Sequence, residues 1–331
     1  MKIHKSREMS SFLFLVALML LVGIVNHDFL KPAFLVNCFN DSVVFTFLAA
    51  GSCFVLLTGE IDVSVGAVLG LSSAVGATIL RDGGSVVTAT LAAIGVGVVV
   101  GFINGVGVAI FNIPSLIFTL GTNGVARGLI YVYTKGHWVE NLPGDFTRFA
   151  SKPLIGGLTI VYAGAILIVA GTHLILQKTR RGRYFVAVGD NSAGANLVGI
   201  PVTLTKVVSY LLCAIFASIA GMIYASRVGF ITPIAGGGYE MKAIAACVLG
   251  GVSLTGGVGS IFGAGIGAVI MSSISRILVF LGFSSDYDNT ITGVILLTIV
   301  VVNTVLQNRQ IITNRRNILL KRTTGKNGGE S

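Results

Sequence analysis

Two carboxylates stand between apolar runs early in the chain. Glu60 and Asp62 lie in a segment of mostly small residues, 57–66, that separates two stretches apolar enough to enter a membrane. An ionised group at the centre of a membrane helix costs on the order of 3 kcal/mol, and it persists mainly where it serves a pathway or a pairing. Two interpretations follow. The segment is either part of a transport pathway or gate, or a tight turn in which Asp62 caps the next helix.

The sequence lacks the motifs of common enzymes. It contains no G-x-x-x-x-G-K-[ST] phosphate loop, no H-E-x-x-H and no G-x-S-x-G. The cysteines and histidines are dispersed, without a C-x-x-C pair or the spacing of metal ligands. We therefore predict no catalytic residue, no metal and no cofactor in this chain, which alone cannot hydrolyse ATP. The four cysteines are interpreted as buried apolar side chains: Cys38, Cys53, Cys213 and Cys247.

The composition excludes an ordinary soluble protein. Of 331 residues, 53% are apolar, 44 are glycine and only 11% are charged, against about 25% charged in a soluble domain. A bilayer core is crossed by roughly 20 apolar residues, so about ten spans would occupy ~200 residues and leave only short loops and tails. The predicted fold class is an all-α polytopic membrane protein, and a large extramembrane catalytic domain is excluded.

Apolar runs predict about ten transmembrane helices. The first, 10–25, follows a basic N-terminus but lacks a small-x-small cleavage site, so we predict a retained helix. The run at 243–257 is short and rich in glycine, which also fits a re-entrant segment. We predict a transmembrane domain over 1–308 and a basic tail at 309–331. The other runs lie at 42–58, 63–80, 85–111, 114–133, 154–177, 207–227, 258–281 and 291–308.

The basic residues predict the orientation. Fourteen of the 23 Lys and Arg gather in the first seven residues, in the loop 178–206 and in the tail. Placing all three clusters in the cytoplasm satisfies the positive-inside rule and requires six spans before the loop and four after it. The ten runs meet this condition. Both termini are then predicted to be cytoplasmic, with the loop 134–153 outside, and the net charge of +10 needs no nucleic-acid partner.

Glycines four residues apart line one face of a helix and let a neighbouring backbone approach closely. Such sets predict a compact multi-helix bundle, although chance alone produces some of them in a chain with 44 glycines. Three further ionisable residues lie at predicted span ends and are interpreted as snorkelling to the interface: Arg227, Glu240 and Lys242. The glycine sets are Gly66 with Gly70; Gly97, Gly101 and Gly105; and Gly259, Gly263 and Gly267.

Four sequence blocks occur in a fixed order over residues 51–267. They are Ile61-Asp62-Val63-Ser64-Val65-Gly66; Gly101-Phe102-Ile103-Asn104-Gly105 with the segment 113–122; Gly182-Arg183 with Gly189-Asp190-Asn191 and Gly199-Ile200; and the segment 238–254. The blocks resemble those of the membrane subunits of bacterial sugar-importing ABC transporters, the ribose and autoinducer-2 group. Glu60 differs from these proteins, which usually carry a neutral residue there.

The resemblance implies an ABC importer permease fold and a subunit that forms half of a channel for autoinducer-2 or a related small sugar in the bacterial inner membrane. It also implies partners: a second permease subunit, like or related, a cytoplasmic ABC ATPase that holds ATP and Mg, and a periplasmic sugar-binding protein. Transport would proceed by alternating access, in which ATP binding and hydrolysis on the partner move a cytoplasmic loop and tilt the spans. No enzymatic activity is expected in this chain.

Small polar side chains should line the path of a neutral sugar rich in hydroxyl groups. The candidates are Asp62, Ser64, Asn104, Thr119, Thr122 and Ser253. The alternative for most of them is a hydrogen bond to a helix carbonyl.

The loop 178–206 is the longest internal cytoplasmic connection and is expected to contact the ATPase. A short helix between Gly189 and Gly199, capped by Asp190 or Asn191, would form this contact. The candidate coupling residues are Arg183, Gly189, Asn191 and Gly199. The alternative is a basic anchor without a mechanical role.

A proton-coupled secondary transporter of a small polar solute is the rival function, with Glu60 and Asp62 as proton carriers. It would need no partner. The sequence shows no inverted repeat, and both carboxylates lie at one predicted membrane face. These observations favour the ABC importer.

Overall fold

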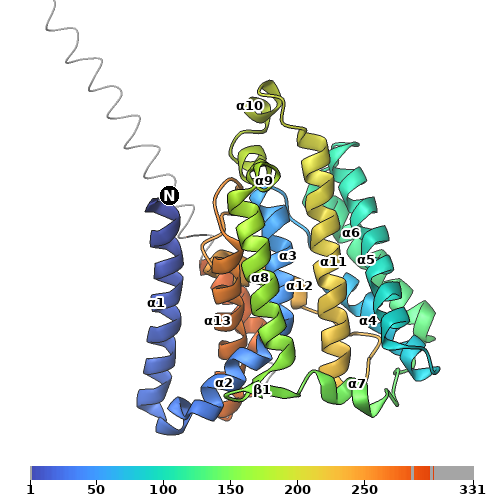
Figure 1. The fold of residues 1–331 in the computed structure, drawn as a ribbon, viewed down its shortest axis with the longest axis vertical. Helices are drawn as coiled ribbons and strands as arrows, with labels where there is room; N and C mark the ends of the chain where they lie inside the picture. Colours follow the sequence, from blue (N-terminus) through green and yellow to red (C-terminus); the bar gives the residue numbers. More distant parts are fainter. Residues whose placement is uncertain (1, 285–286, 299–300, 302–331) are drawn as a thin grey trace, which may run out of the picture. The chain divides into compact units, whose positions relative to one another are not determined.

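The computed structural model describes residues 2–284, 287–298 and 301. The chain divides into two units, residues 1–288 and 289–331. In the second unit, residues 289–298 are helical, and the predicted tail, 309–331, lies outside the described residues. The helices of the first unit, in chain order, are α1 (Lys2–Val25), a short 3-10 helix η1 (His27–Leu30), α2 (Pro32–Asp41), α3 (Val43–Leu57), α4 (Val65–Arg81), α5 (Val86–Ala109), α6 (Ser115–Thr134), α7 (Gly144–Phe149), α8 (Ile160–Lys178), α9 (Arg180–Asp190), α10 (Ser192–Leu197), α11 (Val202–Val228), α12 (Tyr239–Leu249) and α13 (Ile261–Phe280) (Figure 1).

The predicted predominance of helix and the apolar spans are confirmed. Five helices are long and apolar enough to cross a bilayer: α1, α5, α8, α11 and α13. Helices α2 and α3, which meet at a bend of 44°, form a sixth candidate when taken as one span. The described residues thus contain five or six candidate spans by length and composition, and the count of ten stays a prediction.

A small β-hairpin replaces the start of the predicted span 154–177. Strands β1 (Pro153–Ile155) and β2 (Leu158–Thr159) pair antiparallel. Gly156 and Gly157 form the turn with φ of 61° and 85°, which glycine adopts without steric cost. Helix α8 begins only at Ile160, where the side chain of Thr159 caps it by accepting a hydrogen bond from the Tyr162 amide at 3.3 Å.

Two breaks interrupt helical runs of the first unit. Helix α3 ends at Leu57 and α4 begins at Val65, and between them lies the turn 58–64. Helix α12 has only 11 residues, and the loop 250–260 separates it from α13. The predicted run 243–257 is therefore half helix and half loop, because the glycines of this loop hold backbone conformations that a helix does not allow.

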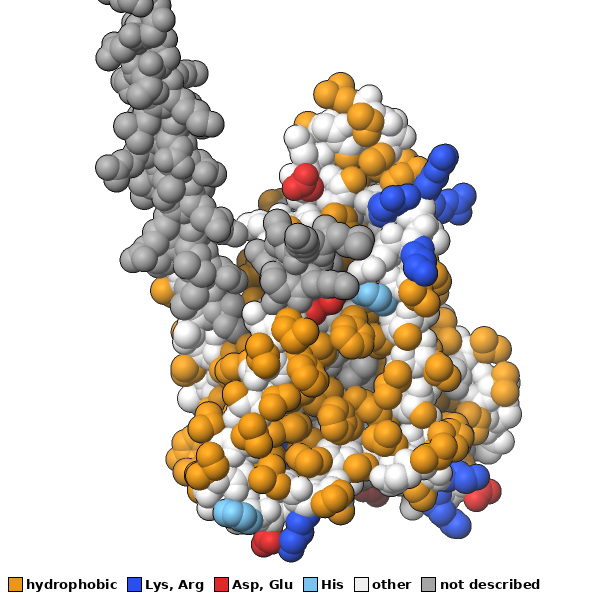
Figure 2. All heavy atoms as spheres, turned by 60° about the vertical axis from the view of Figure 1, so that its left-hand side comes forward, with side chains coloured by type: hydrophobic (Ala, Val, Ile, Leu, Met, Phe, Trp, Pro, Cys, Tyr) orange, Lys and Arg blue, Asp and Glu red, His pale blue; other side chains and the backbone are white. Residues whose placement is uncertain are grey.

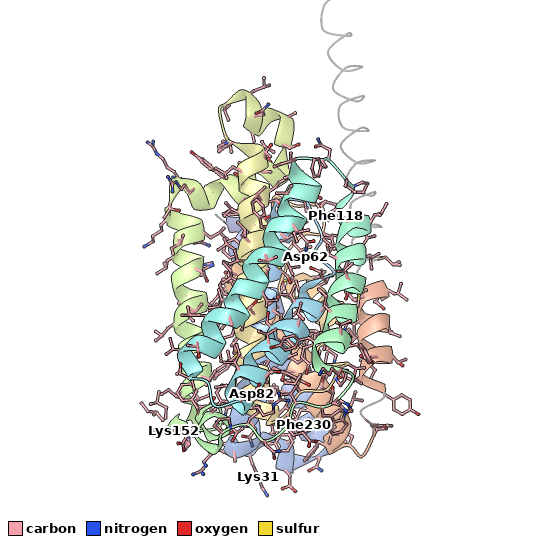
Figure 3. The ribbon with its side chains drawn as sticks, turned by 90° about the vertical axis from the view of Figure 1, so that its right-hand side faces the viewer. Lys31, Asp62, Asp82, Phe118, Lys152 and Phe230 are labelled. Carbon is pink, nitrogen blue, oxygen red and sulfur yellow. The ribbon has the colours of Figure 1, made fainter. Side chains whose placement is uncertain are left out.

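The first unit has two distinct ends. In Figure 1, α9 and α10 lie at one end, and α7 and the hairpin lie at the other. Figure 3 places Lys31, Asp82 and Lys152 at this second end, whereas Asp62 and Phe118 lie toward the first. We call these the α10 end and the α7 end. Figure 2 shows hydrophobic side chains across the middle of one face, with Lys and Arg gathered toward its ends, as in a protein that spans a membrane.

Exposed ion pairs mark the α7 end. Lys31 pairs with Asp28 at 2.7 Å, and Arg81 pairs with Asp82 at 2.9 Å. The adjacent cation lowers the pKa of each of these carboxyl groups, through a hydrogen bond and through its charge. Both carboxylates are therefore ionised at neutral pH, as expected for a surface in contact with water.

The core is built by close packing of helices, and the predicted glycine faces lie where two helices touch. A Cβ atom added at Gly101 would lie 2.8 Å from the Tyr210 carbonyl oxygen of α11, and one at Gly267 would lie 1.8 Å from the Ala246 carbonyl oxygen of α12. Any larger side chain would push these helices apart. The four cysteines are free and buried, as predicted.

Candidate functional site

Four of the six predicted pathway residues meet in one buried cluster near the turn 58–64. Asp62 Oδ1 accepts hydrogen bonds from the Ser64 amide at 2.8 Å and from the Ser64 hydroxyl at 2.6 Å. Asn104 of α5 donates to Ser64 Oγ at 2.8 Å, and Thr119 of α6 accepts from the Val63 amide at 3.2 Å. We call Asp62, Ser64, Asn104 and Thr119 the Asp62 cluster. The cluster thus connects the turn before α4 to α5, through Asn104, and to α6, through Thr119.

The Asp62 cluster is closed in this conformation. Asp62 is 3% exposed, and the other three side chains are 0% exposed. Two of its buried oxygen atoms, Asp62 Oδ2 and Asn104 Oδ1, have no hydrogen-bond partner among the described residues. An unpaired buried acceptor is costly, on the order of 1–3 kcal/mol. The cluster therefore holds unused hydrogen-bonding capacity, which a proton or a donor on a moving segment would satisfy.

The interpretation of Asp62 as a helix cap is wrong, although the tight turn is confirmed. Ser64 occupies the N-cap position of α4, and its side chain makes no capping bond. Asp62 instead bonds to the backbone two residues ahead, which stabilises the turn itself.

The two acidic residues of the turn have different surroundings. Glu60 forms an ion pair with Lys206 of α11 at 2.5 Å, and both side chains are mostly buried. Asp62 has no such cation among its described hydrogen-bond and ion-pair partners. Glu60 therefore connects the turn to α11, and the structure does not bring the two carboxylates together as a pair.

Thr122 and Ser253 lie outside the Asp62 cluster. The Thr122 hydroxyl donates to carbonyl groups of its own helix, to Thr119 at 3.1 Å and to Phe118 at 3.3 Å. Ser253 lies in the loop 250–260, where its hydroxyl is 2.8 Å from that of Thr255. The structure therefore shows the alternative, a hydrogen bond to a helix carbonyl, for Thr122 and also for Thr119, whose hydroxyl donates to the Ser115 carbonyl at 2.8 Å.

The segment between Gly189 and Gly199 forms the predicted short helix, α10. Its cap is Asn191, whose side chain accepts from the Gly194 amide at 2.8 Å. Gly199 ends the segment with a φ of 80°. Leu197 and Val198 are 89% and 76% exposed at this end of the unit, and Arg183 lies exposed on the adjacent α9. The tip of α10 thus presents two large apolar side chains to its surroundings.

The end of α9 is joined to both helix breaks by contacts between backbones. The Gly257 amide donates to the Leu57 carbonyl at 3.1 Å. A Cβ atom added at Gly189 would lie 1.9 Å from that carbonyl oxygen and 2.6 Å from the Gly257 nitrogen, and one at Gly256 would lie 2.8 Å from Gly59 Cα. We call Gly59, Gly189, Gly256 and Gly257 the glycine junction. No side chain separates the three backbones, so the end of α9, the turn 58–64 and the loop 250–260 pack directly against one another.

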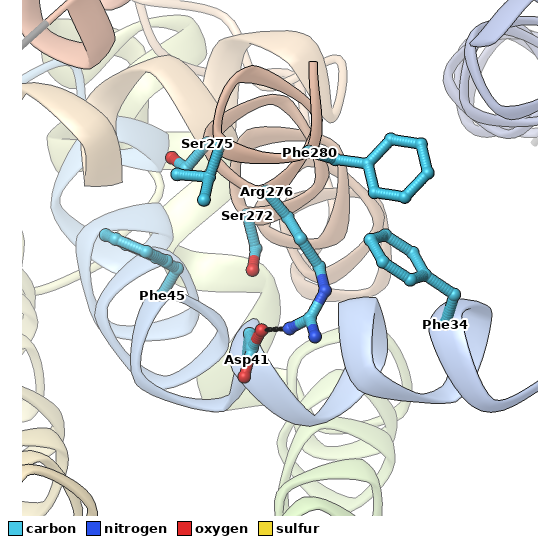
Figure 4. Close-up of a pocket in the computed structure, with 8 residues that line it drawn as sticks. Phe34, Asp41, Phe45, Ser272, Ser275, Arg276 and Phe280 are labelled. Atoms are coloured by element: carbon cyan, nitrogen blue, oxygen red, sulfur yellow. Dashed lines mark hydrogen bonds and ion pairs between the residues drawn. The ribbon is translucent and has the colours of Figure 1, made fainter. Parts of the chain in front are cut away.

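A second polar region lies toward the α7 end, around a cavity of about 510 Å³ between α2, α3 and α13 (Figure 4). Asp41 accepts hydrogen bonds there from Arg276 and, at 2.5 Å, from Arg227. The Arg276 guanidinium also lies 4.9 Å from the centre of the Phe34 ring, a cation–π arrangement. Phe45 and Phe280 complete the aromatic part of the wall.

The snorkelling interpretation of the charged span ends is wrong. Besides the Arg227–Asp41 pair, Glu240 pairs with Arg127 at 3.1 Å, and Lys242, 8% exposed, pairs with Asp288. Each charge is satisfied inside the protein because a partner from a distant element reaches it. The partners Asp41 and Asp288 were not predicted, because their only signal in the sequence is an acidic residue beside an apolar run.

Comparison with known proteins gives a consistent result. The family model described as "Branched-chain amino acid transport system / permease component" matches residues 34–300. The "Autoinducer 2 import system permease protein LsrC" of Escherichia coli (strain K12 / DH10B) is 38% identical over 299 residues, which cover 90% of this chain and 87% of that protein. The proteins of the same name from Yersinia enterocolitica and Yersinia pseudotuberculosis are each 37% identical over 299 residues. The matched region is 90% of this chain, 83% of the first protein and 85% of the second. No solved structure matches significantly.

Proposed function

Because this chain belongs to the family of branched-chain amino acid transport system permease components, we propose that it forms the translocation path of an ATP-driven importer for autoinducer-2 or a related small sugar. It is a multi-pass membrane protein and a transport subunit, not an enzyme. The family description names amino acids, but the relatives that match over 90% of the chain are named for autoinducer-2. Their similarity favours the sugar-like substrate.

The glycine junction is the observation that carries the mechanism. The exposed tip of α10 is suited to contact a cytoplasmic ATPase, and Gly189 connects the preceding helix to the turn 58–64 without an intervening side chain. Binding and hydrolysis of ATP, with its Mg, take place on the partner. The resulting movement of α9 and α10 would then displace the turn and the loop 250–260 together. These are breaks between helices, where backbone angles change most easily.

The Asp62 cluster includes Asp62 and Ser64 of the turn 58–64, which the glycine junction connects to α9. In the present conformation its side chains bond to one another and are closed to solvent. A shift of the turn would separate Ser64 from Asn104 and Thr119 from Val63, and would expose hydroxyl, amide and carboxylate groups to a polar substrate. Thr122 and Ser253, on α6 and on the loop 250–260, would border the same route. We propose that these six residues form the gate and the lining of the path.

The proposed assembly contains this chain, a second permease subunit, a cytoplasmic ABC ATPase and a periplasmic sugar-binding protein, in the bacterial inner membrane. Relatives named as an import system permease support the presence of partners. The proposed topology has about ten spans with both termini in the cytoplasm. The α10 end would then face the cytoplasm and the α7 end the periplasm.

Transport by the complete system tests the function. Vesicles that contain the chain with its ATPase and binding protein are expected to accumulate labelled autoinducer-2 only when ATP is present on the ATPase side. Leucine, the competitor suggested by the family description, should not reduce this uptake. ATP-dependent uptake of labelled leucine, with no uptake of autoinducer-2, would assign the chain to amino acid transport instead.

The topology is tested by cysteine labelling in intact cells. Trp138, 56% exposed near the α7 end, and Arg183, exposed on α9, are replaced singly by cysteine. We expect a membrane-impermeant thiol reagent to label position 138, while position 183 reacts only after the cells are opened. The four native cysteines are buried and should give little background, which the unchanged chain controls. The reverse pattern would show that the orientation is inverted.

A further inference from the structure

A groove near the α7 end opens between helices that are apolar enough to cross a membrane. Its volume is about 360 Å³, and α5, α7, α8 and α11 contribute to its wall. Most of its lining side chains are apolar, among them Val86, Phe149, Met222 and Ile223, and the polar ones are Thr90, Asp145 and Ser226. Water gains few hydrogen bonds from such a wall, so the groove is suited to a hydrocarbon chain.

A polar cavity adjoins this groove. It measures about 530 Å³ and shares Asp145 and Phe149 with the groove. Arg148 and Lys152 also line it. Both are exposed, and within the described residues neither forms an ion pair. Since one carboxylate accompanies two cations, the rim carries a net positive charge, which is complementary to an anion.

Two other exposed cations at this end behave differently. Lys31 and Arg81 are each paired with an aspartate of their own turn. Arg148 and Lys152, like Lys135 near the same end, form no ion pair among the described residues, and of these three only Arg148 and Lys152 line the polar cavity. A guanidinium can bind two oxygen atoms of a phosphodiester at once, and a lysine adds a point charge beside it.

Helix α7 is held in place between the two cavities. The Ser226 hydroxyl of α11 donates to the Phe146 carbonyl at 2.5 Å, and the Phe146 ring is 7% exposed, whereas Phe149 is 53% exposed. The helix thus buries one aromatic ring in the protein and leaves the other at the boundary of the two cavities. This anchoring places Arg148, on α7, beside the groove, and Lys152 follows three residues after the end of the helix.

We propose that a glycerophospholipid binds here, with one acyl chain in the groove and its phosphate on Arg148 and Lys152. Three observations support this binding: the groove is mostly apolar and lies between candidate membrane-spanning helices, it adjoins a cationic rim, and Arg148 and Lys152 have no ion-pair partner within the described residues. A bound lipid would fix the position of α7 against α5 and α11. This site is independent of the proposed transport function.

Retention of phosphatidylglycerol by the purified full-length chain tests the proposal. The chain is reconstituted with this lipid, washed in detergent and examined by native mass spectrometry. We expect one lipid retained per chain. The double replacement Arg148→Ala with Lys152→Ala should reduce retention at least fivefold, and so should Ile223→Trp, which fills the groove. The matched control is Lys31→Ala, which removes a cation that is already paired and should retain lipid as the unchanged chain does.

Three results would overturn the proposal. The first is equal retention in all variants. The second is displacement of the lipid by millimolar inorganic phosphate, because this would mean that the rim binds a free anion and the groove adds nothing. The third is a change of oligomeric state by Ile223→Trp with lipid retention unaltered, because the groove would then hold a second protein chain. Thermal unfolding of each variant establishes that it is folded, and none of these measurements depends on transport.

Discussion

Replacement of Gly189 by alanine is expected to reduce transport at least about tenfold while the protein still inserts in the membrane. The added Cβ would lie 1.9 Å from the Leu57 carbonyl oxygen and 2.6 Å from the Gly257 nitrogen, which are backbone atoms that no rotamer change can move. Overpacking of this kind costs about 1–3 kcal/mol, and ~1.4 kcal/mol corresponds to a factor of ten. The three segments would separate, and movement of α10 would no longer reach the turn 58–64.

The control is Gly171→Ala in α8, where an added Cβ meets nothing within 4 Å. Both changes place alanine in a helix, and alanine favours the helix over glycine by about 1 kcal/mol. If only the Gly189 variant loses uptake, the loss is therefore caused by disruption of the glycine junction and not by the effect of alanine on helix stability. The measurements are autoinducer-2 uptake and substrate-stimulated ATP hydrolysis in reconstituted vesicles, which should fall together. Normal uptake with Gly189→Ala would show that the coupling takes another route.

Asp62→Asn is expected to retain most of the uptake, whereas Asp62→Leu should lose nearly all of it. The asparagine oxygen can still accept the two hydrogen bonds from Ser64, and its NH2 group replaces Oδ2, which has no partner among the described residues. The new donor could also bond to Asn104 Oδ1, the other unpaired oxygen atom of the cluster. Leucine offers no acceptor. Two buried donors of Ser64 would then be unsatisfied, at about 1–3 kcal/mol each.

The same pair of variants decides between the ABC importer and the proton-coupled transporter. A proton carrier must change its protonation state in every cycle, which asparagine cannot do. We therefore expect uptake by the asparagine variant to follow the ATP supply and to be insensitive to a collapsed proton gradient. Accumulation by vesicles that contain this chain alone, driven by an imposed pH gradient without ATP, would contradict the importer. Loss of all uptake with Asp62→Asn would favour a proton-carrying role for Asp62.

Several features of the protein were determined by the sequence alone. Long apolar runs predict spanning helices because the cost of exposing a backbone to hydrocarbon leaves few other structures. The position of the turn 58–64 and the short helix between Gly189 and Gly199 were also predictable, since local glycine and asparagine chemistry ends and starts helices. The four-residue glycine spacing indicated close packing, which the contacts of Gly101 and Gly267 confirm.

Only the tertiary structure decided which distant residues meet. Nothing in the sequence pattern pairs Glu60 with Lys206 or Arg227 with Asp41, and the Gly189 contact with Leu57 and the loop 250–260 was equally hidden. For the same reason, the sequence did not show which of the six predicted pathway residues meet. Hydrogen bonds link Asp62, Ser64 and Asn104, and Thr119 accepts from the adjacent Val63 amide, whereas Thr122 and Ser253 bond elsewhere. Periodicity shows which face of a helix is apolar. It does not show which helix packs against that face, or at which residues the two helices cross. Those are set by how the helices pack, and packing depends on every side chain at each interface.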